Sequence, residues 1–199
     1  MSILVTKEAP DFTAPAVMPD GTIKGDFKLS SLRGQYVSLF FYPLDFTFVC
    51  PTELIAYSQR IDAFKKRDTQ VIGVSIDSQF THLAWRNTAP EKGGIGLIQF
   101  PIVADIKHTI TQSYGVEHPA GVSLRASFLI DKAGIVQHQV VNNLPLGRNI
   151  DEMLRMIDAL QFSEKSGEVC PAGWQAGKAA MKPTAEGVAS YLASHATSL

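Results

Sequence analysis

The chain has 199 residues, of which 45% are hydrophobic and 19% are charged, and its formal net charge is −1. A chain of this length buries enough surface to fold as one domain without disulfide bonds or a structural metal. Two cysteines are too few for a disulfide scaffold or a cysteine-rich zinc site, and the near-zero charge disfavours an electrostatic nucleic-acid binder. The charged fraction lies below the usual value of about 25%, which indicates that another subunit covers part of the surface.

No segment has the pattern expected of a targeting or membrane-spanning sequence. The first residues carry Lys7 and Glu8 and lack the apolar stretch of a signal peptide. The most apolar run, Val37–Leu44, is interrupted by Ser38 and Pro43 and is too short to cross a bilayer. We therefore expect a soluble, cytoplasmic protein, in which cysteines are more often reactive or buried than permanently bonded.

The first half of the chain predicts a β-α-β unit. Tyr36–Tyr42 is a short apolar, aromatic-rich run that is typical of a buried strand, and Gln70–Ile76 is a second. Between them, Pro51 fits the first position of a helix, and apolar residues then recur at spacings of three and four up to the basic residues 65–67. We expect the two strands to be parallel, with a right-handed crossover.

The rest of the chain alternates between helical patterns and apolar runs. The expected helices are Phe80–Asn87, Ile106–Tyr114, Asn149–Phe162 and Thr184–His195. Arg125–Ile130 and Ile135–Val141 flank a short turn and are expected to form an antiparallel hairpin. Residues 163–183 contain three glycines, two prolines and little periodicity, so they predict an extended arm.

Cys50 is the strongest candidate for chemistry because it lies where a strand gives way to a helix. The first N–H groups of a helix carry partial positive charge, which stabilises a thiolate, the reactive form of cysteine. Thr47 is close enough in sequence to reach the sulfur across a tight turn, and Pro43 can shield it from water. The alternative is a buried cysteine that acts only as a small hydrophobic residue.

Two other kinds of cysteine enzyme can be weighed. A dithiol oxidoreductase with a C-x-x-C motif is disfavoured, because Glu53 stands where the second cysteine would be. A cysteine–histidine hydrolase needs a histidine near Cys50 in space, and the sequence leaves this open. Ordinary core or surface roles are favoured for all five histidines, which are His82, His108, His118, His138 and His195.

Cys170 is the second cysteine and lies in the predicted arm. A cysteine at a helix start and another on a mobile arm suit a nucleophile and a resolving partner. The first is oxidised to sulfenic acid, and the second condenses with it to a disulfide. An unremarkable exposed thiol is the alternative for Cys170.

Several motifs resemble those of the peroxiredoxin family. Pro43, Thr47 and Cys50 match the P-x-x-x-T-x-x-C signature, and residues 46–53 (FTFVCPTE) and 168–174 (EVCPAGW) resemble the two cysteine regions of typical two-cysteine peroxiredoxins. That branch includes the alkyl hydroperoxide reductase C subunit. Similar stretches follow in the family's order over nearly the whole chain, at residues 75–78, 82–85, 93–96, 125–131 and 144–148.

The resemblance implies a thioredoxin-like α/β fold with an N-terminal extension and a C-terminal arm. The peroxidase domain would span residues 1–162, and residues 163–199 would form the arm with the resolving cysteine. Cys50 would be the peroxidatic nucleophile and Cys170 the resolving residue, joined in a disulfide between subunits. The supporting residues would be Thr47, which bonds the thiolate and the peroxide, Pro43, which shields the sulfur, Arg125, which supplies positive charge, and Glu53 and Arg148, which orient Arg125.

The implied activity is reduction of hydrogen peroxide and organic hydroperoxides, without a bound cofactor or metal. The reductant would be thioredoxin or a flavoprotein disulfide reductase, and the chain would form homodimers that assemble into a ring, commonly a decamer. Neither nucleic acid nor a membrane is an expected partner. A holdase chaperone and a redox relay are the alternative functions.

One departure from the family pattern concerns over-oxidation. Easily over-oxidised members pair a G-G-[LI]-G loop with a Tyr-Phe pair in the C-terminal helix. This chain has the loop at Gly93–Gly96 but carries Tyr191 and Leu192 at the second position. We therefore expect intermediate sensitivity to sulfinic acid formation.

Overall fold

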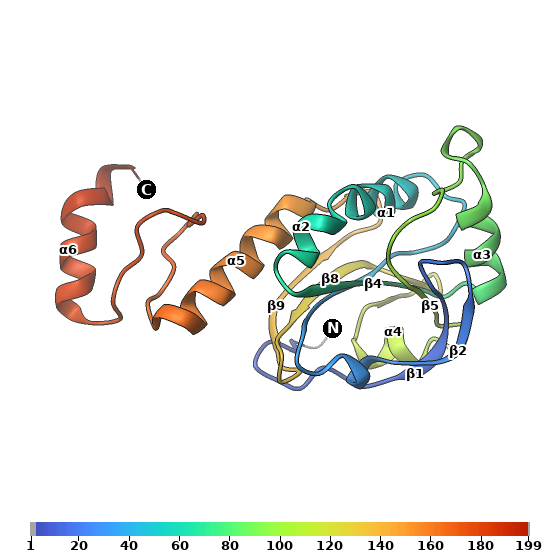
Figure 1. Ribbon diagram of the computed structural model, residues 1–199, viewed down its shortest axis with the longest axis horizontal. Helices are drawn as coiled ribbons and strands as arrows, with labels where there is room; N and C mark the ends of the chain where they lie inside the picture. The colour runs from blue at the N-terminus through green and yellow to red at the C-terminus, as the bar shows by residue number, and fades with distance from the viewer. Residues whose placement is uncertain (1–2, 199) are drawn as a thin grey trace. The chain divides into compact units, whose positions relative to one another are not determined.

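The computed structural model describes residues 3–198 and is shown in Figure 1. The chain divides into two compact units, Met1–Ile150 and Asp151–Leu199. The boundary expected at residue 162, between a peroxidase domain and an arm, stays a prediction about function. Within the described range, no helix is long and apolar enough to cross a membrane.

The first unit is built on a seven-stranded sheet with the order β2-β1-β5-β4-β3-β8-β9. Its strands are β1 (Thr13–Val17), β2 (Ile23–Lys28), β3 (Tyr36–Phe41), β4 (Thr69–Ser75), β5 (Ile102–Ala104), β8 (Arg125–Ile130) and β9 (Val136–Asn142). β3 and β4 pair in parallel, and β8 and β9 pair antiparallel, so both strand pairings predicted from the sequence are confirmed. β6 (Glu117–His118) and β7 (Val122–Ser123) form a separate two-stranded sheet.

β3 lies near the centre of the sheet and is buried on both faces. Successive side chains of a strand point to opposite faces. On one face the Phe41 ring lies 5.1 Å from the ring of Tyr114, just beyond α4 (Thr109–Ser113). On the other, Phe40 stacks on Tyr57 of α1 (Cys50–Gln59), with ring centroids 4.3 Å apart. In Figure 1, α1 and α2 (Ile61–Lys65) accordingly lie over one face of the sheet and α4 over the other.

The predicted helix after β3 is two helices in the structure. α1 ends before Arg60, whose backbone (φ −102°, ψ 8°) is not helical, and α2 begins at the next residue. The apolar spacing is confirmed, because Leu54, Tyr57 and Phe64 are all buried, but the continuity is wrong. The first helical residue is Cys50 itself, so Pro51 takes the second position rather than the first.

Other elements differ at their ends. α3 (Gln79–Asn87) agrees with the prediction to within a residue, whereas α4 begins at Thr109 rather than Ile106. The reason is His108, whose positive φ of 58° cannot continue a helix. The β1–β2 hairpin, the short 3₁₀ helices η1 (Leu29–Leu32) and η2 (Pro90–Lys92), and the pair β6–β7 were not predicted.

The second unit consists of α5 (Ile150–Ser166) from its second residue onward, a long loop, α6 (Ala185–His195) and a final 3₁₀ turn, η3 (Ala196–Ser198). α5 runs on past Phe162, its predicted end, to Ser166. It stops at Gly167, whose φ of +70° suits a glycine at a helix C-terminus. The loop is held by an antiparallel bridge between Val169 and Met181, and the Trp174 ring packs on Phe162 at 4.8 Å. The predicted arm is therefore irregular in its backbone but has packing of its own.

Candidate active site

Cys50 is fully buried at the start of α1, at the carboxyl end of β3. The loop 43–49 joins these two elements, so the position of the sulfur is set by the packing of α1 against the sheet. An open cavity of about 440 Å³ lies beside it, lined by Pro43, Thr47, Phe48, Val49, Arg125, Leu144 and Pro145. A second cavity, of about 470 Å³, opens beside the start of β1 and shares no lining residue with the first.

Two polar side chains contact the sulfur. Thr47 Oγ1 lies 2.9 Å from Cys50 Sγ, and Arg125 Nη1 lies 3.4 Å from the same atom. Thr47 Oγ1 also lies 2.8 Å from the carbonyl oxygen of Leu44. A hydroxyl has one proton to donate and can also accept. It can therefore donate to Leu44 and accept from the Cys50 thiol, or turn its proton toward a thiolate, without moving its oxygen.

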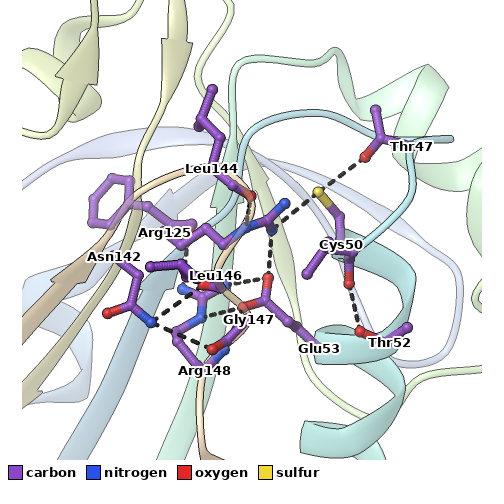
Figure 2. Close-up of polar contacts among 12 residues, drawn as sticks. Thr47, Cys50, Thr52, Glu53, Arg125, Asn142, Leu144, Leu146, Gly147 and Arg148 are labelled. Carbon is purple, nitrogen blue, oxygen red and sulfur yellow. Dashed lines mark hydrogen bonds and ion pairs between the residues drawn. The ribbon is translucent and has the colours of Figure 1, made fainter.

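Arg125 is held in place by a buried carboxylate. Its Nη1 donates to Glu53 Oε2 at 2.7 Å, and its Nε donates to the Leu144 carbonyl at 2.6 Å. Arg148 donates to the same carboxylate through Nε at 2.9 Å and Nη2 at 2.8 Å, and its backbone N–H donates a third hydrogen bond at 3.0 Å. Figure 2 shows both guanidinium groups converging on Glu53 while Thr47 and Arg125 flank the sulfur. All three charged side chains are at most 5% exposed.

This charge cluster has one carboxylate and two guanidinium groups, so it carries a net positive charge beside the sulfur. Buried charges are stable only when they are paired and hydrogen-bonded. A thiolate on Cys50 would neutralise the remaining charge of Glu53, Arg125 and Arg148. The arrangement therefore favours negative charge on the sulfur and on any atom that becomes negative next to it.

The loop that carries Thr47 is anchored by residues that were not predicted to take part in the site. Asp45 is buried, accepts a 2.7 Å hydrogen bond from the Tyr42 hydroxyl and pairs with His82 Nδ1 at 2.7 Å. Its backbone N–H donates to Asp77 Oδ2 at 2.8 Å. Burial raises the pKa of Asp45 above its usual range, and the bond to His82 opposes that rise. The next residue, Phe46, has a φ of +51°, which is unusual for a bulky side chain and is stabilised here by this anchoring.

The sulfur has no histidine as a hydrogen-bond partner in the part of the chain that the structure describes, where its partners are Thr47 and Arg125. His82 pairs with Asp45, and His108 pairs with Glu117 at 2.7 Å. A cysteine–histidine hydrolase is therefore disfavoured.

Cys170 belongs to the second unit and, like Cys50, is a free thiol. It is partly buried, and its thiol lies 3.6 Å from the carbonyl oxygen of Ala159. Burial raises the pKa of this thiol, while Arg155 acts in the opposite direction. Across residues 3–198, no cluster of three or more histidine, cysteine, aspartate or glutamate side chains is placed to hold a metal ion.

A thiol at a helix start, flanked by a threonine and a paired arginine on an α/β sheet, defines a cysteine-dependent redox site. Comparison with known proteins identifies the family. Residues 5–139 match the AhpC/TSA family, and residues 159–194 match the C-terminal domain of 1-Cys peroxiredoxin, although this chain carries Cys170 within that second segment. The chain therefore belongs to the AhpC/TSA family, the peroxiredoxins, which are thiol-dependent peroxidases with a thioredoxin-like fold.

Similar proteins align over nearly their full length. Alkyl hydroperoxide reductase C of Buchnera aphidicola subsp. Schizaphis graminum is 58% identical over 95% of this chain and 96% of its own. The protein of the same name from Helicobacter pylori strain J99 is 56% identical over 96% of both chains. The crystal structure of reduced 2-Cys peroxiredoxin from Plasmodium vivax has a TM-score of 0.94 and 53% identity, covering 96% of this chain and 100% of that one. The predicted fold class and enzyme class are confirmed.

Proposed function

We propose that Cys50 is the peroxidatic nucleophile and that the protein reduces hydrogen peroxide and organic hydroperoxides. The observation that carries this proposal is the pair of donors on one buried sulfur, Thr47 at 2.9 Å and Arg125 at 3.4 Å. The cavity beside it has a polar end at Thr47 and Arg125 and apolar walls at Phe48, Leu144 and Pro145. Such a site can admit both a small peroxide and the alkyl chain of a larger one.

In the first step the Cys50 thiolate attacks the terminal oxygen of the hydroperoxide. A sulfur–oxygen bond forms, the O–O bond breaks, and the alkoxide or hydroxide leaving group takes a proton to become alcohol or water. Cys50 is oxidised to sulfenic acid and the peroxide is reduced. Thr47 and Arg125 donate hydrogen bonds to the reacting atoms, and Pro43, which is buried at the cavity wall, limits access of water.

Ionisation of the thiol alone accounts for little of the acceleration. A thiol with the ordinary pKa of about 8.5 is roughly 3% ionised at pH 7, so full ionisation gains about 30-fold at most. The weaker nucleophilicity of a less basic thiolate removes about 10-fold of that gain. The main contribution of Arg125 is therefore to the transition state, in which charge develops on the leaving oxygen. Glu53 and Arg148 act by holding Arg125 in place.

In the second step the Cys170 thiolate attacks the sulfenic acid on Cys50 of another subunit. A disulfide forms, the S–O bond breaks, and hydroxide leaves and is protonated to water. A dithiol reductant, either thioredoxin or a flavoprotein disulfide reductase, then returns both cysteines to thiols. This cycle assigns residues 1–162 to the peroxidase domain and residues 163–199 to the arm.

The cycle also sets expectations for assembly and location. Exchange of Cys170 between subunits needs at least a homodimer, and we propose a ring of dimers, with a decamer as the expected size. A reducing compartment such as the cytoplasm would supply the dithiol. Sedimentation of the reduced and oxidised protein measures the assembly directly.

The test measures peroxide consumption with dithiothreitol as the reductant. Cys50→Ser is expected to abolish turnover, and Cys170→Ser is expected to keep single-turnover oxidation of Cys50 while losing the intersubunit disulfide on a non-reducing gel. Peroxide consumption that survives Cys50→Ser would overturn the proposal. Coupled NAD(P)H consumption with thioredoxin or with a flavoprotein reductase then distinguishes the two reductants.

A further inference from the structure

The segment that carries Cys170 folds back along α5. After Gly167 the chain reverses, so that Cys170 Sγ lies 3.6 Å from the Ala159 carbonyl and the Trp174 carbonyl lies 2.8 Å from Arg155 Nη1. Residues four apart on a helix share one face, one turn from each other. Arg155 and Ala159 have this spacing, so the segment from Cys170 to Trp174 contacts two successive turns of α5, and the charge of Arg155 acts on the Cys170 thiol.

Arg155 is fixed rather than free at this position. Its Nε and Nη2 form a forked pair of 2.7 Å bonds with the two carboxylate oxygens of Glu152, and Nη2 also lies 3.1 Å from Met156 Sδ. With Nη1 bonded to the Trp174 carbonyl, all three nitrogens of the planar guanidinium have a hydrogen-bond partner. Trp174 itself is buried and packs on Phe162, so the carbonyl that Arg155 binds is held in turn. A forked bond of this kind fixes orientation as well as distance.

We propose that Arg155 is a positioning residue for the resolving step, which holds a positive charge beside Cys170 to favour its thiolate, and that Glu152 limits how strongly that charge acts. This inference rests on the proposed function of Cys170 as the resolving cysteine.

The thiol and the thiolate of Cys170 are favoured by different neighbours. The Ala159 carbonyl can accept the S–H proton and cannot stabilise a thiolate, and partial burial raises the pKa of this thiol. The positive charge of Arg155 lowers that pKa. Glu152 forms an ion pair with Arg155 and cancels part of its charge. The two charged residues therefore act on Cys170 with opposite signs.

The ionisation of Cys170 matters in both halves of the cycle. The thiolate is the nucleophile that displaces hydroxide from the Cys50 sulfenic acid. It is also the leaving group when a reductant attacks the Cys50 sulfur of the disulfide, and a less basic thiolate leaves faster. Arg155 is thus placed to assist formation and cleavage of the same bond.

The experiment measures the pH dependence of iodoacetamide alkylation of Cys170 in the full-length Cys50→Ser protein, where Cys170 is the sole cysteine. Arg155→Met is expected to slow alkylation at pH 7 by about three-fold and to shift the pH profile upward, as loss of a nearby, partly screened charge requires. Glu152→Gln is expected to speed alkylation and shift the profile downward. Arg155→Lys, which keeps the charge and loses the fork, is expected to stay close to the parent profile.

The opposite changes in alkylation rate expected for Arg155→Met and Glu152→Gln distinguish an electrostatic role of Arg155 from a structural one. If the Arg155–Glu152 pair only held the arm together, either substitution would loosen it and move alkylation in the same direction. That result, or an unchanged profile in Arg155→Met, would overturn the proposal. Matching circular dichroism spectra for the variants exclude a folding defect, and Arg155→Lys provides a second test if the Met variant is unstable.

Rapid-mixing fluorescence with Cys50 present completes the test. Arg155→Met is expected to leave the peroxide-dependent phase unchanged and to slow the later phase of disulfide formation by about the factor seen in alkylation. A slower first phase with an unchanged second phase would also contradict the proposal. A parent protein that does not react with peroxide would instead refute the proposed function, and the alkylation profiles would still report whether Arg155 acts on Cys170.

Discussion

Arg125 provides the sharpest test of how the site accelerates peroxide reduction. Its Nη1 lies 3.4 Å from Cys50 Sγ and 2.7 Å from Glu53 Oε2. At an effective dielectric constant of about 20, opposite charges at this separation from the sulfur attract by about 5 kcal/mol, and the nearby carboxylate cancels roughly half of this. A remainder of about 2.5 kcal/mol corresponds to a loss on the order of 100-fold in rate if it acts fully on the transition state.

The expected result for Arg125→Ala is therefore a fall of about 100-fold in the second-order rate constant for hydrogen peroxide. The assay is rapid mixing with detection by tryptophan fluorescence, combined with the thiolate fraction of Cys50 from its ultraviolet absorbance across pH. Loss of ionisation alone would cost only a few-fold, as nucleophilicity compensates. Arg125→Lys keeps a charge but cannot bond Leu144 and Glu53 together, and is expected to fall between parent and Ala. A rate loss that the measured thiolate fraction explains in full would refute a role in the transition state.

Three further predictions concern the charge cluster, a buried tyrosine and the C-terminal helix. Glu53→Gln leaves two buried guanidinium groups without their carboxylate and is expected to lower the free energy of unfolding by about 3–5 kcal/mol in urea titration; a loss below about 1 kcal/mol would show that the arginines find other partners. Burial raises the pKa of Tyr114, so the folded state keeps its proton when the unfolded state loses it. Stability should hold below pH of about 10 and fall above it by up to about 1.4 kcal/mol per pH unit for this residue, a slope that Tyr114→Phe removes. Leu192→Phe introduces the Tyr-Phe pair of easily over-oxidised family members. It is expected to increase sulfinic acid on Cys50 in a peroxide titration followed by mass spectrometry. An unchanged titration would show that the pair does not control over-oxidation in this protein.

The sequence is most informative where local pattern and packing agree. β3, β4 and β8 are rich in apolar residues because both of their faces are covered, and such stretches indicate a buried strand. β2 reads Ile-Lys-Gly-Asp-Phe-Lys and is mostly exposed at the sheet edge. Charges and a glycine suit an edge strand but give no strand signal, so that the β1–β2 hairpin was missed.

The residues of the site also fall into two groups: those whose contact a local pattern predicts, and those brought together only by the fold. Thr47 and Cys50 lie within one turn of chain, and their 2.9 Å contact follows from the loop and helix start that the sequence predicts. Arg125, Glu53 and Arg148 were expected together only through the family resemblance, since no local rule joins residues so far apart. The pairing of Asp45 with His82 was missed, because a lone histidine in a helical pattern is more often an ordinary core or surface residue. The role of His82 depends on the packing of α3 against the sheet, which only the structure shows.

Glu53 has a consequence for how the chain behaves before it is fully folded. It lies on α1, while its partners Arg125 and Arg148 come from β8 and from the segment after β9. Arg148 also donates to the carbonyls of Phe41 and Ala126, tying the cluster to two neighbouring strands of the sheet. A partly folded chain, such as one still emerging from the ribosome, has Cys50 and Thr47 but cannot yet bring both arginines to Glu53. On the proposed function, Cys50 is expected to reach full reactivity only when α1, β8 and the segment after β9 have packed together, so the rate of the peroxide reaction can serve as a probe of native assembly.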